Sequence, residues 1–449
     1  YKIDGQWRPL EKRVEKYVGK DGRILAIDTL YFTHRGPMRR QLGQWLSMRW
    51  TAYEKSHEPD NFMSLGEARN VADWLDRMRD YVAPTQNGLV ADRGGNIAIR
   101  SSGAYPVRPG DGRGDVIRDG SLSANDWVGR LPVDKYPSSL NPPQGFLASA
   151  NQQPVDPAQN TAYMGSDWYS PWRAMRINAL LAADSQLTPD KMRILQTDPG
   201  SARADAFIPQ LVAAARREDS AGRGDQALRE AARILEQWDR RYTRGNHTAV
   251  LFEATMRELG RRTWDELSDA KAPQADTYLL PEEQTLLELL SFPESIWWDD
   301  RRTPAREGRD AIVGASLRKA FTTLRAEKGP PQSSGWLWSN TRHANIRHLL
   351  QIPAFSALKI PVQGGPSTIS PSSGKGTQGA SWRMVVELGR EVRAWAVYPG
   401  GQSGAPASSR YTNRLSRWAM GQLEPVQFPR KPEDLPRSHV ISTLVLRPQ

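Results

Sequence analysis

The side chains that most often perform catalysis form no recognised motif in this sequence. None of the histidines belongs to an HExxH pair, and the five-residue separation of His343 and His348 suits a shared helix face poorly. The chain has no GxSxG nucleophile elbow and no cysteine, which excludes a cysteine nucleophile, a thiolate metal site and disulfides. We therefore assign no catalytic triad from these residues. The histidines are His34, His57, His247, His343, His348 and His439.

The segment FLASANQQP, residues 146–154, contains a polar side chain that could take part in acyl transfer. Asn151 lies in a polar turn that follows the apolar pair Phe146 and Leu147. The side-chain amide of an Asn can donate a hydrogen bond to an oxyanion that develops during the reaction. Because Asn is also common in ordinary turns, the residue types alone leave a catalytic and a structural interpretation open.

A second segment, YPGGQSGAP at 398–406, follows a strand-like run and raises the question of phosphate binding. It lacks the lysine and the spacing of a P-loop, and no GxGxxG motif occurs in the chain. We predict instead a tight loop in which glycine permits a positive φ and a close approach of two backbone segments. We assign no catalytic role to Ser403.

The composition indicates a folded chain with more than one core. The 449 residues are 38 % hydrophobic and 25 % charged, which predicts two or three domains or one large multilayer domain. The net charge is +11, but the basic residues are scattered and form no helix face interleaved with aromatic residues. No run approaches the roughly 18 apolar residues that span a bilayer. We expect no nucleic-acid partner and no membrane span.

Hydrophobic periodicity predicts an α+β chain. Residues 23–34 have the β-branched and aromatic content of strands, and residues 63–82 have apolar positions at helical spacing. Two strand-like runs around Asp92–Asn96 predict a hairpin. We expect residues 1–160 to form part of a core with a long active-site loop, residues 161–335 a mainly helical region, and residues 336–449 a β-rich return to that core.

Several segments together resemble the penicillin acylase (penicillin amidase) family. The similar segments occur in family order and span almost the whole chain, which makes the combined resemblance specific. It implies an N-terminal nucleophile hydrolase: part of a four-layer αββα sandwich, with a helical insertion. The segments are LVADRGGNIAIRSSGAYPVR, GRLPVDKYPSSLNPPQGFLASANQQP, GSDWYSPWRAMRINALL, ILEQWDRR with TAVLFEATMRELGRRTW, and SWRMVVELG with the Gly-rich stretch at 398–406.

The resemblance also implies an activity, namely hydrolysis of the amide between an acyl chain and an amine. The amine would belong to a β-lactam, a homoserine lactone or a similar compound. In this family a Ser at the start of the large chain is the nucleophile, and its own α-amino group, with a pKa of about 8, is the base. No cofactor is required for that chemistry.

Two residues of this chain match functional positions of the family. Asn151 matches the Asn whose amide helps to form the oxyanion hole, and the loss of one such donor typically costs about 3 kcal/mol of transition-state stabilisation. Arg173, in SPWRAMRI, matches an Arg that supports the geometry of the active site, although a structural salt bridge is the other interpretation of this residue.

The sequence departs from the family pattern at three points. Arg35 stands where the family turn has a His, with His34 before it, and Gln152 replaces the second Asn of an Asn pair. The third departure is the nucleophile, which these residues do not supply.

Many relatives bind a structural calcium ion, but the region from Asp156 to Asp167 matches their pattern poorly, so we assign no calcium ligand.

Tyr1 cannot replace the N-terminal Ser, and YKIDGQW resembles a strand inside the large chain. We therefore expect this sequence to be a fragment, inactive alone, whose Ser and small chain lie upstream of it in one precursor. The resemblance implies a heterodimer with that small chain, located in the periplasm or secreted. The alternative is a binding or scaffolding homologue that has lost the nucleophile.

Overall fold

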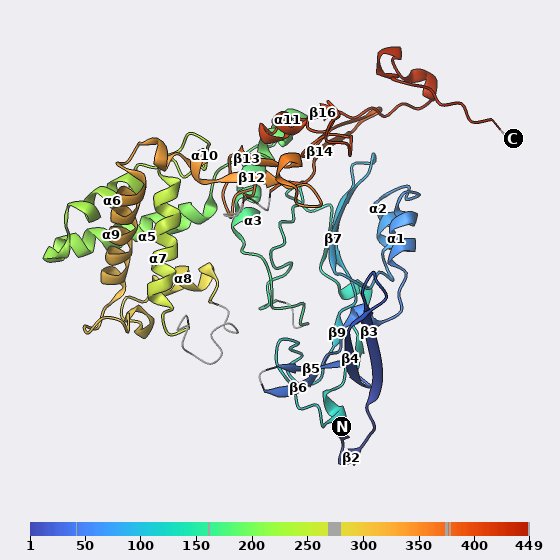
Figure 1. Cartoon of the computed structure of the whole chain (residues 1–449), viewed down its shortest axis with the longest axis horizontal. Coiled ribbons are helices and arrows are strands. Elements are labelled where there is room, and N and C mark those ends of the chain that lie inside the picture. The colour runs from blue at the N-terminus through green and yellow to red at the C-terminus, as the bar shows by residue number, and fades with distance from the viewer. Residues whose placement is uncertain (42, 160–161, 268–279, 373–375, 377–378, 448–449) are drawn as a thin grey trace. The chain divides into compact units, whose positions relative to one another are not determined.

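The computed structural model describes residues 1–41, 43–159, 162–267, 280–372, 376 and 379–447. The chain divides into two compact units, Tyr1–Tyr169 (unit 1) and Ser170–Gln449 (unit 2). Both helices and strands occur, in agreement with the predicted α+β class (Figure 1). The boundaries that the sequence predicts at 160 and 335 stay predictions.

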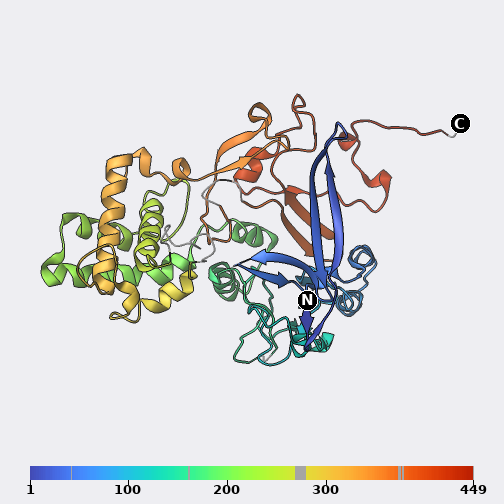
Figure 2. The ribbon, with the colours of Figure 1, turned by 60° about the horizontal axis from the view of Figure 1, so that its bottom comes forward.

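A long two-stranded ribbon dominates the first part of unit 1 (Figure 2). Strand β3 (Glu11–Val18) pairs antiparallel with β4 (Ile24–Thr33), so the strand predicted at 23–34 is confirmed. The sheet continues through β5 (Gly36–Gln41) and β6 (Gln44–Ser47) in the order β3-β4-β5-β6. The turn between β4 and β5 carries the His34–Arg35 pair.

The helix predicted over 63–82 is wrong as a single element. Helix α1 (Glu58–Leu65) ends at Gly66, and α2 (Val71–Arg77) begins after Asn70, whose side chain accepts a hydrogen bond from the Asp73 N–H at 2.9 Å. The Asn cap satisfies an N–H that has no partner inside the helix, so a new helix starts there. The apolar spacing across 63–82 concealed this break.

The predicted hairpin forms as β7 (Gln86–Ala91) and β8 (Ile97–Ser102), with β11 (Ser138–Leu140) on the other side of β8. One carboxylate oxygen of Asp92 accepts hydrogen bonds from the backbone of Gly94 at 2.9 Å and of Asn96 at 3.1 Å. Asp commonly closes a turn in this way. The remaining short strands of unit 1 are β1 (Lys2–Ile3), β2 (Gln6–Trp7), β9 (Pro106–Val107) and β10 (Gly129–Arg130).

This hairpin holds the segment that contains Asn151. The Asn87 amide of β7 donates to the Ser149 hydroxyl at 2.9 Å, and its carbonyl accepts from the Ser101 hydroxyl of β8. Beyond Ser149, the Gln152 side chain accepts a hydrogen bond from the Ala150 N–H at 2.8 Å. The loop around Asn151 is therefore attached to the sheet through Ser149, and the hydrogen bond between Ala150 and Gln152 closes it.

Unit 2 contains the main hydrophobic core, between helices α5 (Ala202–Glu218), α6 (Gln226–Glu236), α7 (Ala249–Thr263) and α9 (Arg309–Lys328) (Figure 1). Leu228, Ala231 and Leu235 recur at helical spacing on one face of α6, and all three side chains are buried in this core. The Asp225 carboxylate accepts from the Leu228 N–H and begins α6. The other helices of unit 2 are α3 (Trp172–Ala182), α4 (Pro189–Leu195), α8 (Glu283–Leu289), α10 (Trp338–Thr341) and α11 (Leu415–Ala419).

The C-terminal part of unit 2 returns to strands. Strand β12 (His343–Ile346) pairs with β13 (Ala357–Pro361), and β14 (Arg383–Leu388) pairs with β15 (Val392–Val397), which also contacts β16 (Glu424–Pro425). A small second core forms here from Ala344, Val385, Val397, Trp418 and Leu423. Within the described ranges, no helix has the length and hydropathy needed to cross a membrane.

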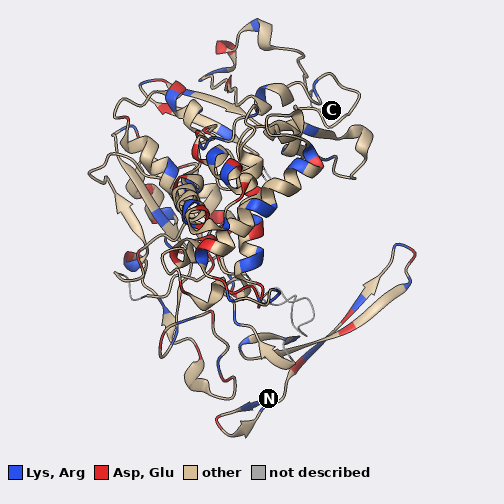
Figure 3. Ribbon diagram, turned by 90° about the vertical axis from the view of Figure 1, so that its left-hand side faces the viewer, with Lys and Arg blue, Asp and Glu red and all other residues tan. Residues whose placement is uncertain are grey.

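Charged residues of both signs alternate along the helices of unit 2 (Figure 3). One ion pair lies inside the core. The Arg203 guanidinium is 5 % exposed and donates to Glu253 at 2.8 Å and to Glu283 at 2.6 Å, while the Tyr242 hydroxyl also donates to Glu253 at 2.6 Å. A buried guanidinium requires compensation of this kind, because removal of one partner leaves a desolvated charge.

We predict that Glu253→Gln lowers the free energy of unfolding by about 3 kcal/mol, since the buried Arg203 would lose one of its two carboxylate partners. Glu236→Gln is the matched control: its partner Arg216 is 65 % exposed, so a change of under about 1 kcal/mol is expected. Urea unfolding followed by circular dichroism measures both. Equal losses in the two variants would contradict the assignment.

We also predict that Gln152→Ala lowers the free energy of unfolding of unit 1 by about 1 kcal/mol, because the Ala150 N–H loses its side-chain acceptor. The neighbouring Gln153 is exposed, so Gln153→Ala is expected to change stability by only a few tenths of a kcal/mol. Thermal unfolding compares the two. A greater loss in Gln153→Ala would show that the loop is held differently.

Candidate active site

Asn151 occupies a strained backbone corner. Its φ is 64°, in the left-handed region that Asn tolerates better than most other residues, and its side chain is exposed. Its carbonyl oxygen accepts a hydrogen bond from the Tyr169 N–H at 3.1 Å. With the Gln152 bond on the other side, the backbone of Asn151 is fixed from both directions.

This geometry suits a preorganised donor. An amide that stabilises an oxyanion must already be in place when the negative charge develops, because reorganisation during the reaction would cost free energy. Strained residues that the surrounding structure holds in place are concentrated at functional sites. A positive φ also occurs at Asn141 and is common for Asn in turns, so the oxyanion role of Asn151 stays a prediction that this geometry allows.

Gln152, which departs from the family's Asn pair, has a structural role in this chain. Its longer side chain reaches back to the Ala150 N–H, and Ala150 itself is buried. Sequence reasoning could not identify this contact, since the substitution of Gln for Asn shows only a change of length. With Gln in place of Asn at position 152, a side-chain hydrogen bond still holds the backbone next to Asn151.

Arg173 lies in the first turn of α3 in unit 2, whereas Asn151 belongs to unit 1. The start of α3 is fixed by Trp172, which is buried against Phe207 in the helical core. One turn later, Arg176 donates to Asp198 at 2.7 and 3.2 Å. Arg176 thus forms a salt bridge within unit 2, and Arg173 is half-buried beside the fixed end of the helix, where its supporting role stays a prediction.

The Asp198 carboxylate is the centre of this attachment. Arg241 donates to it at 3.0 Å in addition to Arg176. Burial opposes ionisation of Asp198, but the two guanidinium groups prevail and hold the pKa of that carboxyl below its ordinary value. The ionised Asp198 therefore ties α3 to the segment after α6 at neutral pH.

The His34–Arg35 departure is also explained by packing. The Arg35 guanidinium is 11 % exposed and donates to Asp126 at 2.5 Å and to the carbonyls of Gly120 and Leu122 at 2.6 and 2.9 Å. His34 lies 3.1 Å from the other oxygen of Asp126. Burial raises the pKa of the Asp126 carboxyl, but the hydrogen bonds from Arg35 and His34 outweigh it and leave the pKa below its ordinary value. Arg35 therefore fixes the loop 119–126.

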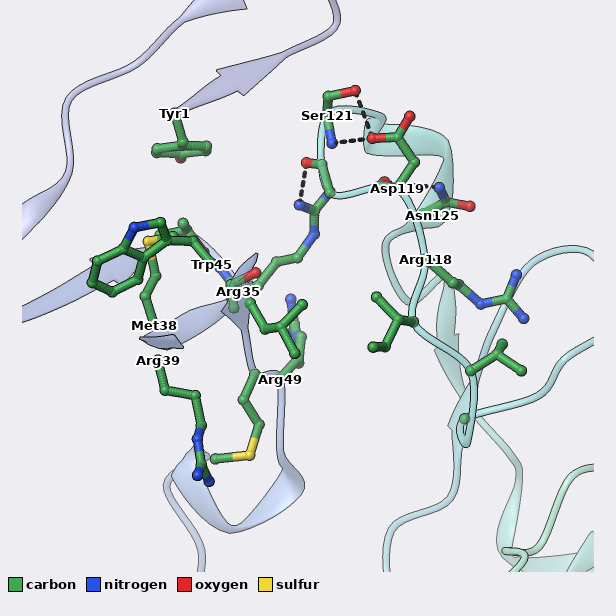
Figure 4. Close-up of a pocket in the computed structure, with 18 of the residues that line it drawn as sticks. Tyr1, Arg35, Met38, Arg39, Trp45, Arg49, Arg118, Asp119, Ser121 and Asn125 are labelled. Atoms are coloured by element: carbon green, nitrogen blue, oxygen red, sulfur yellow. Dashed lines mark hydrogen bonds between the residues drawn. The ribbon is translucent and has the colours of Figure 1, made fainter. Parts of the chain in front are cut away.

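A cavity of about 580 Å³ lies beside Arg35 in unit 1 (Figure 4). Its described lining includes one acidic residue, Asp119, which bonds to Ser121, and two tryptophans, Trp45 and Trp127. Carboxylates outside the lining pair with three of its arginines, namely Asp126 with Arg35, Asp115 with Arg113 and Asp111 with Arg118. Neither Asn151 nor Arg173 lines this cavity. Its basic residues are Lys2, Arg35, Arg39, Arg49, Arg108, Arg113 and Arg118.

The Gly-rich stretch at 398–406 forms the tight loop that the sequence predicts. Gly400 has φ of 109°, and a Cβ on Gly401 would lie 1.9 Å from the carbonyl oxygen of Arg410. Only glycine allows these two backbone segments to approach so closely. The Ser403 hydroxyl accepts a hydrogen bond from the Ala405 N–H at 3.1 Å, a contact within the loop.

No group of three or more His, Asp or Glu side chains suited to a metal ion occurs in the part of the chain that the structure describes. In the region considered for calcium, Asp156 instead accepts a hydrogen bond from the Ala158 N–H at 2.9 Å, as turn residues do. The described residues therefore give no ligand set for calcium, and structural calcium stays a prediction.

Comparison with known proteins adds an independent line of evidence. The sequence profile of the penicillin amidase family matches residues 1–434. An acyl-homoserine lactone acylase of Pseudomonas aeruginosa is 27 % identical over 502 aligned positions that cover 100 % of this chain and 58 % of that protein. A penicillin acylase 2 proenzyme of Pseudomonas sp. (strain SE83) is 25 % identical and covers 80 % of this chain and 46 % of the proenzyme.

The fold has a counterpart among solved structures. A thermostable penicillin G acylase from Alcaligenes faecalis superimposes with a TM-score of 0.72 at 18 % sequence identity, covering 100 % of this chain and 84 % of that chain. At this identity the likeness concerns the fold. The chain spans little more than half the length of the acyl-homoserine lactone acylase that it matches. The profile match covers almost the whole sequence, and we conclude that the chain belongs to the penicillin amidase family.

Proposed function

We propose that this chain is a portion of an amidohydrolase that cleaves the amide bond between an acyl chain and an amine. The observation that carries the proposal is Asn151, which combines the family position of an oxyanion donor with a fixed, exposed backbone corner. In the proposed reaction a hydroxyl nucleophile adds to the amide carbonyl, the amine leaves with a proton, and water releases the acid. The Asn151 amide donates to the carbonyl oxygen while that oxygen carries negative charge.

The nucleophile of this reaction would be an N-terminal Ser in a polypeptide segment outside the 449 residues. Its support is the resemblance to N-terminal nucleophile hydrolases, together with the 58 % of the relative's length that this chain spans. The same precursor would supply a small chain as partner. We further propose a periplasmic or secreted location.

The β3–β4 ribbon offers a surface for that partner. Val14 and Ile27 share one face of the ribbon with Lys16 and are 58 and 59 % exposed. A two-stranded ribbon is at best marginally stable in water, and an apolar face of this kind is usually covered. A small chain that packs on this face would stabilise the ribbon.

We propose acyl-homoserine lactones as the first substrates to test, with β-lactam acyl amides second. In sequence alignment, relatives that match 100 % of this chain are named acyl-homoserine lactone acylases, whereas two named penicillin acylases match 80 and 53 % of it. In structure, a penicillin G acylase also covers the whole chain, so β-lactam amides stay the second class to test. In both classes the bond cleaved would be an acyl amide, so the role of Asn151 is the same.

The alternative is a binding or scaffolding homologue. The two proposals predict different residues at the cleavage point upstream of Tyr1. The reading frame upstream of the Tyr1 codon distinguishes the two. A frame that continues through a small-chain region to a Ser at a cleavage point supports the amidohydrolase. A different residue in place of that Ser would remove the nucleophile and favour the alternative.

We predict that Asn151→Ala in the full-length protein lowers kcat for an acyl-homoserine lactone by about 100-fold or more, because one oxyanion donor is lost. Ser403→Ala, in the Gly-rich loop, is expected to retain normal turnover. Release of the homoserine lactone amine measures both variants. Turnover of Asn151→Ala equal to that of Ser403→Ala would exclude the amide from the mechanism, while inactivity of the unsubstituted protein would instead contradict the proposed activity.

A second prediction separates the two arginines of α3. Arg173→Leu is expected to lower kcat at least tenfold with little change in thermal stability, since we place Arg173 as a positioning residue. Arg176→Leu removes one of the two arginine partners of the buried Asp198, so it should lower the unfolding temperature and leave the kcat of the folded fraction near normal. The reverse pattern would assign the structural role to Arg173.

A further inference from the structure

A second cavity, of about 290 Å³, lies in unit 2 where segments that are far apart in the sequence meet. Thr197 follows α4, Arg244 lies between α6 and α7, Gln363 follows β13, and Ser370 lies in the loop before β14. Arg383, the first residue of β14, also lines the cavity. Two guanidinium groups and several neutral polar groups therefore surround one space.

Arg383 is the more deeply placed of the two arginines. It is 9 % exposed, and its guanidinium donates to the Trp418 carbonyl at 2.8 Å and to the Ser370 hydroxyl at 3.4 Å. It also lies 5.5 Å from the centre of the Trp418 ring. Its buried Nε has no hydrogen-bond partner among the described residues. The neutral partners of Arg383 leave its positive charge uncompensated.

Arg244 is half-buried and has the same kind of partners. Its guanidinium donates to the Ala419 carbonyl and contacts the sulfur of Met420. Among the described residues, no carboxylate forms a salt bridge with Arg244 or Arg383. Burial lowers the pKa of both guanidinium groups, although arginine remains charged at neutral pH.

The sequence explains why an acid is missing here. No Asp or Glu occurs between Asp239 and Glu253, between Glu327 and Glu387, or between Glu391 and Glu424. These acid-free segments supply both arginines and most of the cavity wall. Arg203, which is 4 % exposed, has Glu253 and Glu283 as carboxylate partners, whereas the buried Arg342 lies over the Trp338 ring. The pair Arg244 and Arg383 therefore differs from Arg203 in its neutral partners, and from Arg342 in lining this cavity together.

A buried cation without a counter-charge is costly, and two such cations beside one cavity repel each other. An anion inside the cavity would remove both costs at once. Guanidinium groups bind the oxygens of small oxyanions through charge-assisted hydrogen bonds, and hydroxyl groups add further donors. The Ser370 hydroxyl lies next to Arg383, and Thr197 and Thr243 also line the cavity.

We propose that this cavity binds a small inorganic oxyanion of the phosphate type between Arg244 and Arg383. The bound anion would link the segment between α6 and α7 to β14 and to the end of α11, and so stabilise the attachment of the C-terminal strands to the helical part of unit 2. The inference does not rest on the proposed amidase activity, because it concerns residues outside that site.

Calorimetric titration and thermal unfolding of the full chain with inorganic phosphate test this proposal, with sodium chloride at equal ionic strength as the reference. We expect saturable phosphate binding and a rise in the unfolding temperature beyond that in chloride. Arg383→Met should weaken phosphate binding at least tenfold. Arg216→Met, which alters an exposed arginine paired with Glu236, should bind phosphate normally.

Arg244→Gln and Ser370→Ala keep the proposal testable if Arg383→Met does not fold. Arg244→Gln should weaken phosphate binding at least tenfold, and Ser370→Ala should weaken it less, because both guanidinium groups remain. Equal stabilisation by phosphate and chloride would overturn the proposal. Phosphate binding that is unchanged in Arg244→Gln, or in a folded Arg383→Met, would also overturn it.

Discussion

The left-handed backbone of Asn151 is the constraint on which the candidate site depends. A residue at φ of 64° keeps that conformation only where its surroundings fix it, and in this chain the Tyr169 and Gln152 hydrogen bonds do so. The bonds from Asn87 to Ser149 and from Ser101 to Asn87 extend the support into the β7–β8 hairpin. The sheet of unit 1 thus positions one side-chain amide.

Unit 2 is organised around the compensation of buried charge. Arg203 is neutralised inside the helical core, and Asp198 joins α3 to the end of α6 through two arginines. The same principle makes the pair Arg244 and Arg383 conspicuous, because their partners are carbonyl, hydroxyl and sulfur atoms. A single electrostatic rule therefore accounts for the structural ion pairs and for the anion site that we infer.

Local features were predictable from the sequence where a short motif determines them. The turn at Asp92–Asn96, the stripe of α6 and the glycine requirement at Gly401 all follow from residues close together in the chain. The helix predicted over 63–82 failed because apolar spacing continued across a break that Gly66 and the Asn70 cap impose. Periodicity alone does not report a helix end.

The site was predictable only in part. Asn151 could be named from its resemblance to a family position, but its strained backbone and the role of Gln152 required coordinates. Arg35 is bonded to a loop about ninety residues later in the chain, and no local pattern encodes so distant a contact. The pair Arg244 and Arg383 was likewise hidden, because only the fold brings acid-free segments together.

The most direct test of the account is a crystal structure of the full-length protein with a transition-state analogue bound covalently to its nucleophile. We predict that the Nδ2 atom of Asn151 lies about 2.7–3.1 Å from the oxygen that mimics the oxyanion. We also predict that Asn151 retains its positive φ, because this backbone turn is formed before substrate binds. An analogue whose oxygen is held by other donors, with the Asn151 amide beyond hydrogen-bond reach, would contradict the central claim.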